Sequence, residues 1–82
     1  MAQMTPDLYK YMKDRLRILN RKIDSVKAYI VINRNKKISA TTKKQQMHYL
    51  KRQKAYENKL VKMELKKRHL EAILKRYARY FE

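Results

Sequence analysis

Apolar residues recur at seven-residue intervals through the first half of the chain, in two rows that interleave by alternating steps of three and four residues. In heptad positions a and d, these rows contain Tyr9, Met12, Leu16, Leu19, Ile23, Val26, Ile30 and Asn33. Such spacing places the side chains on one narrow stripe of an α-helix, as in the seam of a coiled coil. The first half is therefore expected to pack one face of a long helix against another helix.

A helix start signal precedes this stripe. Thr5 is a favourable N-cap residue, Pro6 suits the first helical position, and Asp7 lies where the helix dipole favours a negative charge. Residues that favour helices become sparse after Asn33. We therefore expect a helix over residues 6–36, preceded by an N-terminal tail over residues 1–5.

A second pair of interleaved rows runs through the rest of the chain. Thr42, with Gln45 three residues later, matches a capping box, and no Gly or Pro follows. The rows contain Gln46, Tyr49, Gln53, Tyr56, Leu60, Met63, Lys67, Leu70, Leu74, Tyr77 and Phe81. The pattern predicts a loop over residues 37–41 and a helix over residues 42–81, within one domain.

The two patterns match when the helices are paired antiparallel. Each a residue then meets a d residue whose number adds with its own to 79, as for Leu19 with Leu60. This register places the turn between Ser39 and Ala40. The sequence thus predicts an all-α protein in which two long antiparallel helices form a coiled-coil-like helical hairpin. The alternative is one continuous helix, which the β-branched and hydroxyl residues over 38–42 disfavour without forbidding.

In this register the second helix extends past the start of the first, so its last apolar residues have no partner in the chain. Exposed apolar patches are typical of interfaces, and small helical proteins without disulfides commonly gain stability by oligomerising. We therefore expect a homodimer, or a protein partner, to cover this C-terminal patch. The C-terminal patch consists of Leu70, Ile73, Leu74, Tyr77, Tyr80 and Phe81.

The chain is strongly basic, with 23 Lys and Arg against 7 Asp and Glu, for a net charge of +16 in 82 residues. Glu57, Glu64 and Glu71 form one row beside the seam. The other flank brings basic g rows of both helices together with no acid between them, which costs stability and favours a polyanion there. The expected nucleic-acid-binding residues are Arg15, Lys22, Arg52, Lys59 and Lys66 on that flank, with Lys43, Lys44 and Lys62 adding to the same field.

These charges indicate a small protein that grips the phosphate backbone of DNA or RNA with salt-dependent affinity. No zinc-finger spacing, helix-turn-helix pattern or RNA-recognition aromatic motif is present, so we expect no readout of base sequence. The alternative is a basic adaptor or inhibitor that binds an acidic protein partner through the C-terminal patch. A third hypothesis, attachment to an anionic membrane surface, requires an open apolar stripe, which the partner helix would cover.

Residue types needed for catalysis or metal binding are scarce. The chain lacks Cys and Gly, which removes thiolate ligands, disulfides and glycine loops for phosphate. His48 and His69 lie far apart, with no carboxylate at ligand spacing. We expect no enzyme, no cofactor and no metal. The longest apolar run, residues 28–32, is too short to span a membrane, and no secretion signal begins the chain, so we expect a cytoplasmic or nucleoid-associated protein.

Overall fold

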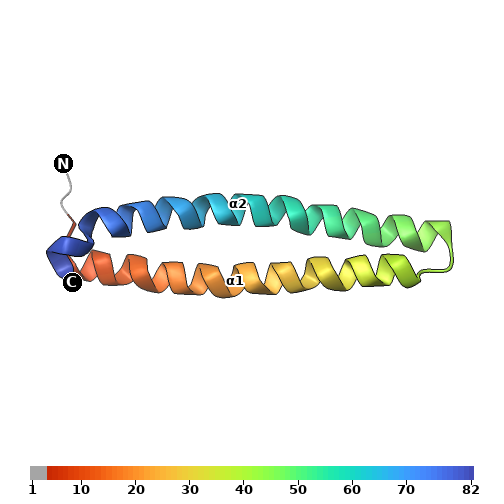
Figure 1. Ribbon diagram of the computed structural model, residues 1–82, viewed down its shortest axis with the longest axis horizontal. Coiled ribbons are helices and arrows are strands. Elements are labelled where there is room, and N and C mark those ends of the chain that lie inside the picture. Colours follow the sequence, from red (N-terminus) through yellow and green to blue (C-terminus); the bar gives the residue numbers. More distant parts are fainter. Residues whose placement is uncertain (1–3) are drawn as a thin grey trace.

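The computed structural model describes residues 4–82, which fold into two antiparallel helices that pack against each other along most of their length (Figure 1). Helix α1 spans Pro6–Ser39 and α2 spans Lys43–Phe81, and the Cα positions extend over 57 × 20 × 15 Å. The predicted all-α helical hairpin is confirmed, and the alternative of one continuous helix is wrong. The expected tail over residues 1–5 lies mostly outside the described residues.

Threonine side chains cap the start of both helices. The Oγ1 atom of Thr5 accepts a hydrogen bond from the Leu8 amide at 3.1 Å, and the Oγ1 atom of Thr42 accepts one from the Gln45 amide at 3.2 Å. Each bond satisfies an amide that has no carbonyl partner in the first helical turn. The two threonines therefore determine where the helices begin.

Helix α1 continues to Ser39, past the expected range of 6–36. The Ser39 hydroxyl donates to the Asn35 carbonyl at 3.0 Å, so it bonds within the helix instead of competing with it. Lys36 and Lys37 lie in the last turn, where the helix dipole favours positive charge. Ala40 then leaves the helix with an extended backbone, and the turn centres on Thr41.

The centre of the hairpin is a thin apolar core. Ile23, Val26 and Ile30 of α1 are buried against Met63 of α2. Leu19, Tyr56 and Leu60 are half-buried around them. Asn33 is also buried at the seam, and its side-chain amide donates to the Tyr29 carbonyl at 2.8 Å. The core thus forms from the a and d rows that the sequence pattern identifies.

The pairing of these rows differs from the expected register. The rings of Tyr29 and Tyr56 stack with centroids 5.3 Å apart, and the Lys36 ammonium lies 5.9 Å from the Tyr49 ring centroid. In both pairs the two residue numbers add to 85. The predicted register, in which facing residue numbers add to 79, is therefore wrong by about one heptad. A shift of one heptad keeps a residues opposite d residues, so the apolar pattern alone does not distinguish the two registers.

Two physical reasons favour the observed register. Because α1 reaches Ser39, the chain turns over residues 40–42, which is later than the turn between Ser39 and Ala40 that the predicted pairing requires. The first turn of α2 accordingly extends beyond the end of α1 (Figure 1). The shift also brings the last turns of α2 alongside the first turns of α1, where the rings of Tyr9 and Phe81 stack at 4.9 Å.

The C-terminal patch is consequently not the uncovered surface that the sequence predicts. Leu74 is buried, Phe81 stacks on Tyr9, and Leu70, Ile73 and Tyr77 are half-buried. Tyr80 is the exception, with 63% of its surface exposed. The expected overhang of α2 is therefore wrong, because α1 itself covers most of this patch.

An ion pair lies at the same end of the hairpin. The Lys13 ammonium donates a hydrogen bond to the Glu82 carboxylate, and both side chains are half-exposed. This hydrogen bond, together with the charge of Lys13, holds the pKa of Glu82 below its ordinary value and raises the pKa of Lys13. Burial, and secondarily the Glu82 carboxylate, raises the pKa of Tyr9.

The register is tested by crosslinking, since the chain has no native Cys. In the observed register, Ile30→Cys with Tyr56→Cys is expected to crosslink rapidly within one chain through a short thiol reagent. Ile23→Cys with Tyr56→Cys matches the register of 79 and is displaced by about 10 Å along the helix, so it should react slowly. Gel mobility and mass spectrometry measure the extent of crosslinking over time. Faster reaction of the second pair would contradict the observed register and support the one in which facing residue numbers add to 79.

The ion pair between Lys13 and Glu82 is tested by following the titration of the Glu82 carboxyl group with NMR. Its pKa is expected to lie below 4.5 and to rise toward 4.5 in Lys13→Gln. Any stability from the pair is present above the ordinary glutamate pKa and is lost as the pH falls through the lowered folded value. The matched control is Lys27→Gln, which removes the same charge elsewhere on α1 and should leave the Glu82 pKa unchanged. A Glu82 pKa equal in wild type and Lys13→Gln would refute the pair.

Candidate nucleic-acid interface

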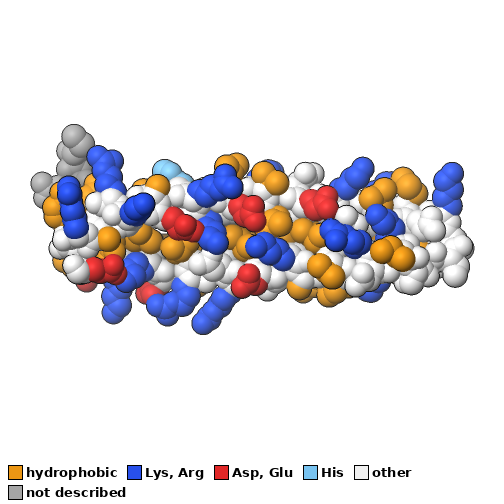
Figure 2. Space-filling model, in the orientation of Figure 1, with side chains coloured by type: hydrophobic (Ala, Val, Ile, Leu, Met, Phe, Trp, Pro, Cys, Tyr) orange, Lys and Arg blue, Asp and Glu red, His pale blue; other side chains and the backbone are white. Residues whose placement is uncertain are grey.

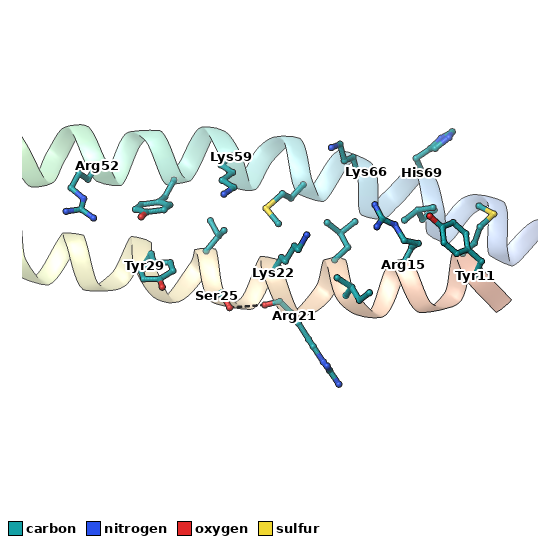
Figure 3. Close-up of a pocket in the computed structure, with 17 residues that line it drawn as sticks. Tyr11, Arg15, Arg21, Lys22, Ser25, Tyr29, Arg52, Lys59, Lys66 and His69 are labelled. Atoms are coloured by element: carbon teal, nitrogen blue, oxygen red, sulfur yellow. Dashed lines mark hydrogen bonds between the residues drawn. The ribbon is translucent and has the colours of Figure 1, made fainter. Parts of the chain in front are cut away.

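A groove with a volume of about 1130 Å³ follows the seam on one side of the hairpin (Figure 3). It runs along most of α1 and the middle of α2, with residues of both helices forming its walls. The apolar residues at its base belong to the seam and include Met12, Leu19, Val26, Tyr56, Met63 and Leu70. The groove is therefore an open trough whose base is the edge of the core.

The structure brings together in this groove the five basic residues that the sequence predicts on one flank. In Figure 3, Arg15 and Lys22 point from α1 toward α2, while Arg52 and Lys59 point from α2 toward α1. Lys66 lines the groove too, but its side chain extends away from α1. All five positions are exposed to solvent, so their charged groups are accessible to a ligand.

The charges in this groove are of one sign. No Asp or Glu is present among the described residues that line it. The ion pairs found within residues 4–82 join Lys13 to Glu82, Arg17 to Asp14 and Lys67 to Glu71, and none uses any of the six Lys and Arg residues that line the groove, which are Arg21 and the five predicted ones. Facing like charges cost some tenths of a kcal/mol per pair on a helical surface. The groove therefore carries positive potential that the described residues do not neutralise.

The opposite face of the hairpin is different. Figure 2 shows several acidic side chains among the basic ones along α2. In Figure 3, α2 lies above α1 as in Figure 1, but the turn is on the left instead of the right, so the hairpin is seen from behind. The groove therefore opens on the face that is hidden in Figure 2. On the acidic row, Glu57 accepts a hydrogen bond from Gln53 at 3.0 Å, and Glu71 lies 3.9 Å from Lys67. Opposite charges are thus mixed on one face, while the groove is basic.

Three of the expected nucleic-acid-binding residues lie elsewhere. Lys43 and Lys44 are exposed in the first turn of α2, at the turn end of the hairpin. Lys62 is exposed on α2 and does not line the groove. These residues add to the general positive potential, but none of them lines the groove.

Sequence reasoning missed the aromatic residues of the groove. Tyr11 and Tyr29 line it, and about half of each side chain is exposed. The signal was present in the heptad pattern, because Tyr29 belongs to the same g row as Arg15 and Lys22, and Tyr11 belongs to the neighbouring c row. His69 also lines the groove, with its ring directed outward (Figure 3).

Comparisons with protein-family models, with curated proteins and with solved structures find no match to this chain. Within residues 4–82, neither helix is long and apolar enough to cross a membrane. The same residues contain no group of three His, Asp or Glu side chains placed to hold a metal ion.

Proposed function

We propose that this protein is a small non-enzymatic nucleic-acid-binding protein that holds the phosphate backbone in its basic groove without reading base sequence. The observation that supports this proposal is the convergence of Arg15, Lys22, Arg52 and Lys59 from two helices, with no acidic residue among the described lining. Phosphate oxygens would neutralise charges that otherwise repel one another across the seam. Binding would thereby remove a cost that the folded hairpin carries.

The spacing of the cations suits a repeating anion. Within the g row of each helix, successive groove cations are seven residues apart, which corresponds to about 10 Å along the axis. A stacked strand carries one phosphate per ~3.4 Å, so about every third phosphate meets a cation of each helix. Arg presents a planar group that pairs with two phosphate oxygens, and Lys acts as a point charge. Backbone contacts of this kind position a nucleic acid but carry no sequence information.

The adaptor alternative rests on less surface than the sequence suggests. Its expected anchors, Leu74 and Phe81, are engaged within the hairpin, and Tyr80 remains exposed. In this alternative, an acidic protein would bind the basic groove instead of the C-terminal patch. Nucleic-acid binding would place the protein where nucleic acid is, in the cytoplasm or nucleoid.

We also propose that two hairpins associate as a homodimer. Six hydrophobic residues are buried among those described, which is a small core for a rod of this length. The net charge of +16 opposes association, so salt should promote it. Sedimentation equilibrium is expected to give twice the chain mass of 10.1 kDa at moderate salt. A mass of one chain at every salt and protein concentration would refute the dimer.

The nucleic-acid proposal is tested with the double variant Lys22→Gln, Lys59→Gln. We expect its affinity for a labelled oligonucleotide to fall about tenfold at 0.15 M salt, and the slope of log affinity against log salt to decrease by roughly 1.4–1.8. Fluorescence anisotropy measures both quantities. The variant should unfold at the same or a higher temperature than wild type, since it removes facing like charges.

The matched control is Lys27→Gln, Lys54→Gln. It removes the same total charge, but neither residue lines the groove. Its affinity should fall much less than that of the groove variant. Equal losses in the two variants would show that net charge alone attracts nucleic acid, and would overturn the assignment of binding to the groove.

A further inference from the structure

Two tyrosines are the first and last residues that α1 contributes to the basic groove. Tyr11 lies near the open end of the hairpin and Tyr29 lies toward the turn, with Arg15 and Lys22 between them on α1 (Figure 3). Their exposed fractions are 58% and 49%, which is high for aromatic residues beside an apolar seam. They are separated by 18 residues, or about 27 Å along the helix. The groove therefore combines cationic walls with aromatic surface over the length of a short oligonucleotide.

The turn end of the groove already contains an aromatic stack. The rings of Tyr29 and Tyr56 lie 5.3 Å apart at an interplanar angle of 17°, so they are nearly parallel. Tyr56 is half-buried in the seam, while Tyr29 remains half-exposed. Tyr56 thus packs on one face of the Tyr29 ring and holds it in place, while about half of Tyr29 stays exposed where it lines the groove. Supported aromatic rings of this kind lose little conformational entropy when a ligand stacks on them.

We infer that the groove binds a single strand of nucleic acid in preference to a duplex, with its phosphates on the groove cations and unpaired bases stacked on Tyr29 and Tyr11. This inference rests on the proposed function and names its substrate class. Non-specific single-strand binders combine a basic groove that follows the backbone with aromatic side chains that receive the bases. Both parts occur here in one groove, on residues of both helices.

A duplex makes poor use of this groove. Its bases are stacked on one another along the whole helix, so their faces are not available to Tyr11 or Tyr29 except at its ends. Its outer surface is charged and polar, and it gains nothing from the apolar seam residues Met12 and Met63 at the base of the groove. A single strand presents both charged phosphates and apolar base faces, which match the walls and the base of the groove.

The inference is tested with a labelled oligothymidylate of about eight nucleotides, which fills ~27 Å at ~3.4 Å per nucleotide, and with a duplex of equal length. We expect the single strand to bind wild-type protein more tightly. Tyr29→Leu should weaken single-strand binding about fivefold or more, the loss of one base stack, and leave duplex binding unchanged. Its salt slope should equal that of wild type, because no charge is removed.

Two variants separate stacking from other effects. Tyr29→Phe keeps the ring and should bind the single strand like wild type. Tyr80→Leu removes a tyrosine outside the groove that is more exposed than Tyr29, at 63% against 49%, and should also bind like wild type. Because the chain has no Trp, tyrosine emission reports stacking directly, and Tyr29→Leu should lose part of the quenching that the single strand causes. Circular dichroism verifies that each variant keeps its helices.

The outcomes distinguish this inference from the proposed function. Duplex binding as tight as single-strand binding, with no effect of Tyr29→Leu, would refute the stacking inference but leave backbone binding intact. Poly-glutamate bound as tightly as either nucleic acid would refute both proposals and indicate an acidic protein as the partner. A loss in Tyr29→Phe equal to that in Tyr29→Leu would assign the effect to the hydroxyl and overturn the role of the ring.

Discussion

The two helices are held together by one narrow apolar seam, in which Ile23, Val26 and Ile30 pack against Met63. The alignment of this seam determines which side chains face each other on its flanks. On one flank it places the basic g rows opposite each other and produces a groove with cations on both walls. At the open end it brings Phe81 onto Tyr9 and the Glu82 carboxylate onto Lys13. The basic groove is therefore a direct consequence of core packing.

The hairpin combines a thin core with a groove of repelling charges, and these two features oppose each other. A rod of two helices buries few side chains, since most of each helix surface remains in solvent. Facing Lys and Arg residues in the groove reduce the stability that this core provides. If the groove binds a polyanion as proposed, that cost would be reversed, and ligand binding would be coupled to folding stability. The acidic row on the other face does not line the groove, so no described acidic side chain there offsets its positive charges.

Much of the groove could be predicted from heptad positions. Arg15 and Lys22 of α1, with Arg52 and Lys59 of α2, occupy g positions, and g positions of antiparallel helices lie on the same flank whichever heptad is paired. This conclusion holds despite the error in register, because a shift of seven residues returns every row to the same side. Tyr29 lies in the same row, so its place in the groove followed from the same pattern, although its stack on Tyr56 did not.

The sequence by itself determined the two helices, their caps at Thr5 and Thr42, and the face that each helix buries, because these depend on local spacing and on hydrogen bonds between near neighbours. Only the tertiary structure decided the register, because the heptad pattern repeats and several alignments satisfy it equally well. The extension of α1 to Ser39 moved the turn and resolved this choice, through a hydroxyl that bonds within the helix instead of ending it. The observed register also places α1 against Leu74 and Phe81, which the sequence predicted to be uncovered. Their burial depends on the residues that lie opposite them, and the sequence pattern of one helix does not specify these.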